Sequence, residues 1–395
     1  MNADGKTVLI VGTESDNPFA IDIGAYCRQA IEIADILSLK TFANSEFCPR
    51  FISDEKDLSS IGQKLAGRIV VVVSTASNQY SRNELAWRNL LVTRGARDNG
   101  AEQVVLVEPD LFFSAQDRGP RPEHGDLDRA RDVSDYKKFD GQPFSSRFYA
   151  EALALSGVSA VITVHNHSVS VQRLFKQQMG DGFLNLSPAE VFADYIRTSE
   201  VAPGLHSGEG LIVCAPDKGA RQFATEVHEH LASSKADLLF IAKQRLGERK
   251  VSSLVDVDSP SPVEALHGRD VVIFDDMVRT GGTIMECCRL LKEAGARRMV
   301  FFVTHFYASR EVRENLHNPA LDEIVTTNTI PCILNRDMQG RLRRKMTVLK
   351  LEKWISRTVL GFLGRPTDHL EEPLYTVDMS SKNPRWQAMA KKRAG

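Results

Sequence analysis

Two adjacent acids, Asp275 and Asp276, end an apolar run in the stretch VVIFDDMVRTGGT, residues 271–283. An arginine, two hydroxyl side chains and two glycines follow them. Glycines permit tight turns and close approach of the backbone, and the free N–H groups at the start of a following helix stabilise an anion. A phosphate therefore fits residues 279–283, whereas the acids fit sugar hydroxyls or a bound Mg²⁺. The alternative is a plain strand followed by a capped helix, but it leaves two acids at a buried strand end without a partner.

This stretch resembles the phosphoribosyl-pyrophosphate loop of type I phosphoribosyltransferases and of ribose-phosphate pyrophosphokinases. The resemblance implies that Asp275 and Asp276 hold the ribose 2- and 3-hydroxyls, directly or through a metal. It also implies that the loop binds the 5-phosphate. The loop residues are Arg279, Thr280, Gly281, Gly282 and Thr283. The chain contains no GxxxxGK[ST] pattern, which argues against a P-loop nucleotide site.

Three further segments resemble the pyrophosphokinases rather than the simple transferases. They are VITVHNHS (161–168), CAPDKGARQFA (214–224) and IAKQRLGERKV (241–251). The resemblance implies that His167 and Asp217 bind the Mg²⁺ on ATP, and that Lys243 and Arg245 are the catalytic cations. His165 stands where the family has an acid. Taken without the resemblance, the histidines are better read as ordinary strand-end residues. The alternative for Lys243 and Arg245 is a solvated loop.

The first half of the chain resembles the same family at two ATP-contacting segments. TFANSEFCPRF (41–51) is similar to a loop that contacts the adenine of ATP on a neighbouring subunit, and SAQDR (114–118) is similar to a second ATP contact. Asn44, Ser45 and Ala115 replace an acid, a glycine and an arginine of the family pattern. The implied ATP-binding residues are Phe42, Asn44, Glu46, Gln116, Asp117 and Arg118.

Short apolar, β-branched runs alternate with longer amphipathic stretches along the chain. Continuous apolar strands separated by helices indicate parallel sheets that are covered on both faces, so the fold class is α/β. The predicted strands are 7–12, 68–75, 102–109, 159–166, 210–217, 237–243, 270–276 and 298–305, and the clearest predicted helices are 82–100 and 281–296. The stretch 117–143 is polar and rich in glycine, proline and charge, and it predicts a long surface loop.

With the resemblance, these elements predict two phosphoribosyltransferase-type domains, each a mainly parallel sheet flanked by helices. The N-terminal synthetase-like domain spans 1–187, and the segment 346–365 returns to it. The C-terminal domain with the ribose-phosphate loop spans 188–345, and 366–395 form a tail. The stretch 119–141 is longer than the family's usual connection.

The bulk composition suits a soluble globular protein. The 395 residues are 42% hydrophobic and 26% charged, with a formal net charge of −1, so no global charge favours nucleic acid or a membrane surface. The longest apolar run, IVVVV at 69–73, is far too short to span a bilayer. No signal peptide is expected, and the scattered cysteines are read as reduced thiols. These features predict a cytoplasmic protein.

The resemblance implies a ribose-phosphate diphosphokinase. Such an enzyme moves the diphosphoryl group of ATP to the 1-hydroxyl of ribose 5-phosphate, with Mg²⁺, and gives phosphoribosyl pyrophosphate and AMP. It also implies a dimer-based homo-oligomer. Three alternatives remain: a pyrophosphokinase with another acceptor such as ADP-ribose, which Arg279 would suit; a phosphoribosyltransferase; and a non-catalytic regulatory homologue.

Overall fold

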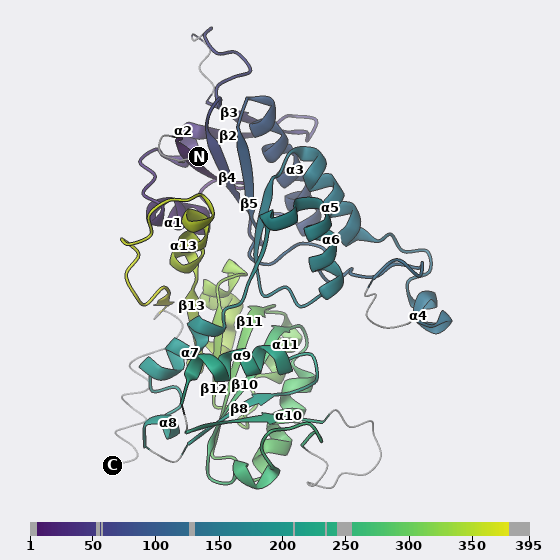
Figure 1. Ribbon diagram of the computed structural model, residues 1–395, viewed down its shortest axis with the longest axis vertical. Helices are drawn as coiled ribbons and strands as arrows, with labels where there is room; N and C mark the ends of the chain where they lie inside the picture. The colour runs from purple at the N-terminus through teal and green to yellow at the C-terminus, as the bar shows by residue number, and fades with distance from the viewer. Residues whose placement is uncertain are drawn as a thin grey trace. The chain divides into compact units, whose positions relative to one another are not determined.

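The structure of the protein is a computed structural model that describes residues 6–52, 56, 58–125, 131–207, 210–233, 235–242 and 255–378. The chain divides into two compact units (Figure 1). The first unit comprises Met1–Leu186 and Glu352–Glu371, and the second comprises Ser187–Leu351 and Glu372–Gly395. Each unit is built around its own sheet, and we describe each by itself.

The sheet of the first unit is entirely parallel, with strand order β1-β4-β5-β6-β7. Its strands are β1 (Val8–Gly12), β4 (Ile69–Val73), β5 (Gln103–Val107), β6 (Ala160–Val164) and β7 (Phe183–Leu186). All residues of β4 and β6 are buried. A strand that is buried on both faces reads as a continuous apolar run, which is why these segments do not alternate with polar residues.

Helices cover both faces of this sheet. They are α1 (Pro18–Tyr26), α2 (Ile33–Ile36), α3 (Arg82–Asp98), α5 (Ser145–Ser156), α6 (Val169–Met179) and α13 (Glu352–Phe362). A further short helix, α4 (Val133–Lys138), has no buried residue and lies away from the sheet (Figure 1). Apolar residues of α3, α5 and α6 join one buried cluster with every second strand residue. Helices α1 and α13 pack against each other apart from that cluster (Figure 1). Helix α3 begins at a capping box, in which Ser81 and Glu84 bond each other's backbone N–H.

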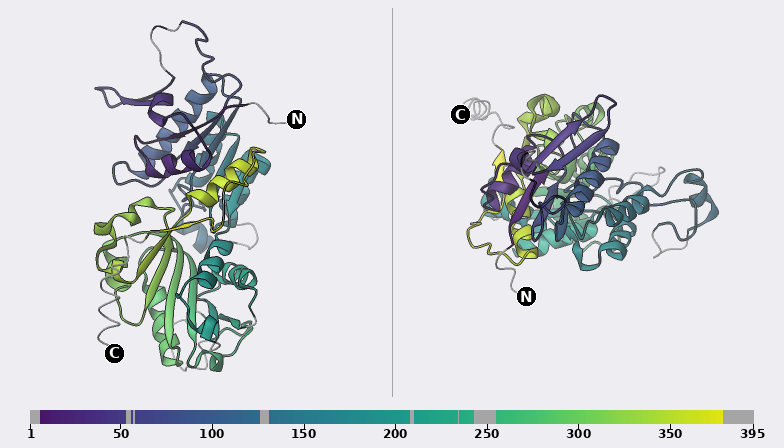
Figure 2. Two further views of the ribbon diagram at one scale, coloured as in Figure 1. Left: turned by 90° about the vertical axis from the view of Figure 1, so that its left-hand side faces the viewer. Right: turned by 90° about the horizontal axis from the view of Figure 1, so that it is seen from above.

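The second unit contains a seven-stranded sheet of order β14-β13-β12-β11-β10-β8-β9. Its strands are β8 (Leu211–Ala215), β9 (Ala236–Phe240), β10 (Asp270–Val278), β11 (Arg298–Phe306), β12 (Glu323–Thr327), β13 (Met346–Lys350) and β14 (Thr376–Asp378). Only β14 is antiparallel to its neighbour. The strands β10 and β11, green in Figure 2, are paired along nearly their whole length. This confirms the predicted α/β class with mainly parallel sheets flanked by helices.

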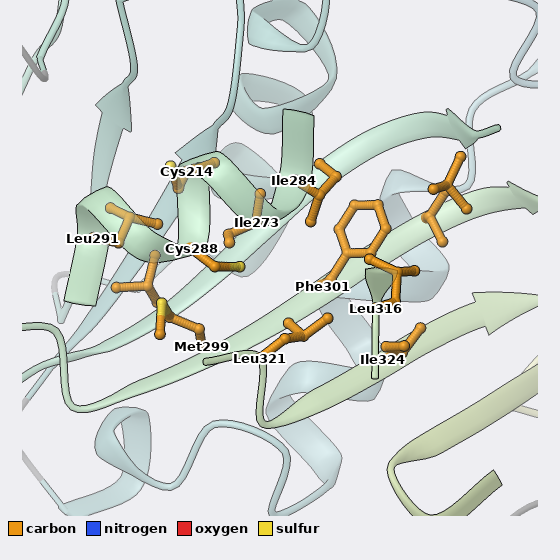
Figure 3. Close-up of a cluster of buried hydrophobic side chains, with 14 of the residues drawn as sticks. Cys214, Ile273, Ile284, Cys288, Leu291, Met299, Phe301, Leu316, Leu321 and Ile324 are labelled. Carbon is orange, nitrogen blue, oxygen red and sulfur yellow. The ribbon is translucent and has the colours of Figure 1, made fainter. Parts of the chain in front are cut away.

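The faces of the second sheet are covered by two different sets of side chains. The helices of this unit are α7 (Ala189–Thr198), α8 (Gly204–Ser207), α9 (Arg221–Leu231), α10 (Gly282–Glu293), α11 (Arg310–Asn315) and α12 (Arg336–Gln339), with 3₁₀ turns at Val263–Leu266, Pro331–Leu334 and Gly340–Arg344. On one face, α10 and α11 close an apolar cluster that includes Ile273, Phe301 and Leu316 (Figure 3). On the other, Phe192 and Phe223 of α7 and α9 meet strand phenylalanines edge to face.

The segment that returns to the first unit has other bounds than the predicted 346–365. Residues 346–350 do not return to the first unit, because β13 pairs in parallel with β12 of the second sheet. The return begins at Glu352 and ends at Glu371. The chain then re-enters the second unit and adds β14. The residues from 379 onwards lie outside the described structure. In the described part of the chain, no helix combines the length and apolarity needed to cross a bilayer.

Candidate active site

The two acids of the phosphate-loop stretch lie within strand β10, and the strand continues past them. Asp275 pairs with Val303 of β11, and the register holds to Val278 opposite Phe306. The strand is therefore longer than the predicted 270–276. Asp275 and Asp276 are half-buried at its carboxyl end, the edge at which α/β folds bind ligands.

A left-handed glycine turns the chain from β10 into helix α10. Gly281 has φ of 80° and stands at the helix N-cap. The turn is fixed from outside, because Asn315 Nδ2 donates to the carbonyl of Thr280 at 2.7 Å. Leu316 packs so closely below that a Cβ on Gly281 would lie 3.1 Å from Leu316 Cδ2. Only glycine fits this position without strain.

The loop made by this turn is open to a ligand. Arg279, Thr280, Gly282 and Thr283 are exposed. A Cβ added to Gly282 would meet nothing within 4 Å. The first amides of a helix have no intrahelical acceptor, so those of α10 can donate to an anion in the loop. The predicted loop residues are thus brought together in the described structure.

Asp217 lies close to this pair of acids, because β8 is the neighbour of β10. It follows β8, and its Oδ1 accepts hydrogen bonds from the N–H groups of Gly219 and Ala220 at 2.9 and 3.3 Å. Burial raises the pKa of Asp275 well above its usual value, and the negative charges of Asp276 and Asp217 raise it further. Carboxylates gathered at one strand edge fit a divalent cation, and oxygen ligands are those Mg²⁺ takes. Among the described residues, however, no three His, Cys, Asp or Glu side chains already form a metal-binding group.

A cavity of about 500 Å³ adjoins Asp217. It is lined by Asp217, Lys218, Gly219, Ile241, Asp256, Val257 and Asp258. Arg221 forms ion pairs with Asp256 and Asp258 and lies over the ring of Phe240, with 5.1 Å from Cζ to the ring centroid. Sequence reasoning missed Asp256 and Asp258, although the alternating acids of VDVD were visible. Lys243 and Arg245, the predicted catalytic cations, lie outside the described residues.

In the first unit, the predicted adenine-contacting loop is the tip of a hairpin. Strands β2 (Leu37–Thr41) and β3 (Phe47–Phe51) pair antiparallel, and residues 42–46 join them. Ser45 has φ of 70°, the conformation that favours glycine, and Asn44 Oδ1 accepts from Glu46 N at 3.2 Å. The serine thus adopts a backbone conformation that suits a glycine, and the asparagine makes a local bond that an acid makes equally well. Phe42 is 44% exposed, with Lys40 Nζ 4.9 Å from its ring centroid.

The second predicted ATP segment lies beside the histidine segment at the carboxyl edge of the first sheet. Asp117 Oδ2 accepts from Ser168 Oγ at 2.9 Å, and its carbonyl accepts from Ser170 Oγ at 2.9 Å. Gln116 is exposed, and its carbonyl accepts from Ser146 Oγ at 2.9 Å. The described structure therefore brings residues 116–118 and 165–170 together, as neighbouring strands β5 and β6 require.

The two histidines follow strand β6, which ends earlier than the predicted strand 159–166. Strand β6 ends at Val164, and His165 is left-handed, with φ of 48°, while its N–H donates to Leu186 O at 2.8 Å. His165 is half-buried and His167 is exposed. His167 belongs to the first unit and Asp217 to the second, so their shared role at a metal stays a prediction.

Comparisons with known proteins agree with this arrangement. Residues 195–332 match the model of the phosphoribosyl transferase domain family. The chain is 30% identical over 288 residues to a ribose-phosphate pyrophosphokinase of Thermococcus kodakarensis, covering 73% of this chain and 86% of that protein. It is 28% identical over 278 residues to one of Methanopyrus kandleri, covering 70% and 81%.

The fold comparison covers more of the chain. The crystal structure of a phosphoribosylpyrophosphate synthetase from Mycobacterium smegmatis superimposes with a TM-score of 0.67 at 20% identity, over 91% of this chain and 99% of that one. At this identity the likeness concerns the fold. The sequence matches reach 30% identity and cover most of the length of the relatives, and they show that the chain belongs to the ribose-phosphate pyrophosphokinase family.

Proposed function

We propose that this protein is a ribose-phosphate diphosphokinase, which uses ATP and ribose 5-phosphate and forms phosphoribosyl pyrophosphate and AMP. The observation that carries the proposal is the geometry of residues 275–283. Two half-buried acids at the carboxyl end of β10 can bind a sugar. The exposed N-terminus of α10, which begins after Gly281, can bind the phosphate of that sugar. The relatives at 28–30% identity are named for this activity.

Each part of the ribose phosphate has a matching group in this proposal. Asp275 and Asp276 accept hydrogen bonds from the 2- and 3-hydroxyls, and residues 279–283 bind the 5-phosphate through amides, hydroxyls and the Arg279 guanidinium. This fixes the 1-hydroxyl for attack on the β-phosphorus of ATP. An oxygen–phosphorus bond forms there, the bond from the β-phosphorus to the bridging oxygen of the α-phosphate breaks, and AMP leaves with a proton released.

The proposed contacts with the nucleotide follow from the family resemblance. Gln116, Asp117, Arg118 and the hairpin tip with Phe42, Asn44 and Glu46 would contact ATP, and His167 and Asp217 would hold Mg²⁺. Bound Mg²⁺ neutralises phosphate charge in such transfers. Lys243 and Arg245 would stabilise the charge that develops on the transferred group. A dimer-based homo-oligomer and a cytoplasmic location complete the proposal and rest on the family resemblance.

A second candidate is a pyrophosphokinase whose acceptor carries more negative charge, such as ADP-ribose. The observation that favours it is Arg279, which is exposed and whose guanidinium bonds to none of the described residues. The guanidinium of an exposed arginine can form a bidentate pair with an additional phosphate. The alanine at position 115, where the family has an arginine, fits the regulatory, non-catalytic alternative, but the retention of His167, Lys243 and Arg245 disfavours it.

The test is AMP formation by the purified protein with Mg-ATP and ribose 5-phosphate. We expect AMP with ribose 5-phosphate and at least a hundredfold less with Lys243→Ala, since removing one group that stabilises transition-state charge reduces the rate by about 10²–10³. No AMP above the level of the Lys243→Ala control would refute the activity. AMP formation with ADP-ribose alone, lost in Arg279→Ala, would select the second candidate.

A further inference from the structure

The polar stretch after Arg118 folds back on itself around a buried arginine. The side chain of Arg131 is 3% exposed. Its Nη2 donates to the carbonyl of Gly119 at 2.9 Å, and its Nη1 donates to that of Arg121 at 3.2 Å. Its Nε donates to Asp135 Oδ2 at 2.6 Å. Arg131 therefore ties the start of the stretch to helix α4, which carries Asp135.

The other oxygen of Asp135 faces Arg118. Asp135 Oδ1 lies 3.3 Å from Arg118 Nη1, and Asp117 Oδ1 lies 3.6 Å from its Nε. The ring of Phe139, just after α4, lies 4.8 Å from Arg118 Cζ. The guanidinium is thus paired along its edge and stacked on an aromatic face. Both contacts restrict the rotamers of a long, otherwise mobile side chain.

Arg118 is held at the place where a nucleotide contact is expected. Its neighbour Asp117 is bonded to Ser168, in the segment that carries His167 at the carboxyl edge of the first sheet. Ala115 is exposed, at the position where the family pattern has an arginine. One cation fewer in this segment makes the orientation of the remaining one more important for binding an anion.

We propose that Asp135 and Phe139 are positioning residues for ATP binding, and that they hold the Arg118 guanidinium in its nucleotide-binding orientation. The inference rests on the proposed function, because the role of Arg118 comes from the family resemblance. It adds a task for the stretch 119–141, which is longer than the family's usual connection. An arginine side chain that is already ordered in the folded protein loses less conformational entropy when ATP binds.

The experiment measures the dissociation constant of Mg-ATP by calorimetry, without ribose 5-phosphate, and then the KM for ATP and kcat in the AMP assay. Asp135→Ala is compared with Asp140→Ala, which removes the same charge from the same stretch but whose partner is Lys137. Phe139→Leu is the second variant, since it keeps an apolar side chain and removes the stacking ring. Thermal unfolding checks that each variant is folded.

We expect Asp135→Ala and Phe139→Leu to weaken ATP binding about three- to fivefold, as the loss of one partly exposed ion pair or stack allows. The KM for ATP should rise by the same factor, with kcat changed less than about twofold. Asp140→Ala should match the unsubstituted protein. In an Arg118→Ala background, Asp135→Ala should have no further effect, because the pair acts as one unit.

Several results would overturn the inference. If the Asp135→Ala variant binds ATP as tightly as the Asp140→Ala variant, or more tightly, the carboxylate of Asp135 does not orient Arg118 for the nucleotide. Additive effects in the double variant, or an Arg118→Ala variant with normal ATP affinity, would do the same. Normal ATP binding without AMP formation would instead refute the proposed function alone. Absence of ATP binding by the unsubstituted protein would refute both.

Discussion

Replacing Gly281 by alanine tests whether the turn before α10 has the form described. At φ of 80° an L-residue is strained by about 1–2 kcal/mol. The new Cβ would also lie 3.1 and 3.2 Å from two carbons of Leu316, a residue with no exposed surface that cannot easily move aside. We expect a total loss of about 2 kcal/mol from the stability of the second unit.

Gly282→Ala is the matched control, one residue further along. Its Cβ meets nothing within 4 Å, and the residue is the first of the helix. Because alanine has the higher helix propensity, we expect this change to be neutral or to stabilise by up to about 1 kcal/mol. The two variants differ from the natural protein by the same single methyl group, so their contrast isolates the backbone conformation and the contact with Leu316.

Differential scanning calorimetry without ligands measures both variants. For a unit of roughly this size, 1 kcal/mol corresponds to a shift of about 2–4 °C, so Gly281→Ala should lower the melting temperature by about 4–8 °C. Gly282→Ala should leave it unchanged or raise it slightly. Equal shifts in the two variants, or a neutral Gly281→Ala, would refute the left-handed turn packed on Leu316.

Two further predictions concern buried acids and pH. Burial and the charges of Asp276 and Asp217 raise the pKa of Asp275, so the folded form binds its proton more tightly and loses stability as pH rises through that pKa. Asp275→Asn should therefore raise the melting temperature most at alkaline pH, and this gain should shrink toward pH 4. The same variant should form AMP only near the background rate. An increase in melting temperature that grows on acidification would contradict this. Burial likewise raises the pKa of Glu108 to about 8 from an ordinary 4.5, and stability should fall by up to about 1.4 kcal/mol per pH unit across that range. Glu108→Gln should remove this slope in denaturation curves measured from pH 5 to pH 9, and an unchanged slope would exclude Glu108 as its source.

The sequence predicted the elements that are long, apolar and regular. Most of the parallel strands stood out as continuous apolar runs, and α3 stood out as a long amphipathic stretch. The parallel strands β7, β12 and β13 were not predicted. The hairpin β2–β3 was missed. Its sequences LSLKT and FCPRF are half exposed, lack β-branched runs and include a proline, so nothing in them exceeds the signal of a loop.

For the site, the sequence located the groups whose chemistry depends on neighbours in the chain. Residues 275–283 needed only a strand, a turn and a helix in succession. The groups that fix the loop and Arg118 could not be predicted, because they come from elsewhere in the chain. Asn315 and Leu316 reach the loop from the end of α11, and Asp135 reaches Arg118 from a helix hidden in a polar stretch. Such contacts follow from tertiary packing and leave no periodic signal.

The path of the chain between the two units has a consequence for synthesis on the ribosome. The chain passes from one unit to the other after Leu186, after Leu351 and after Glu371. Helix α13, which packs against α1, therefore emerges only after the second unit's parallel strands have been made. Until α13 has been made, α1 lacks the helix that it packs against, and β14 follows α13 in the chain. Both units therefore gain their last described element only after most of the chain has been synthesised.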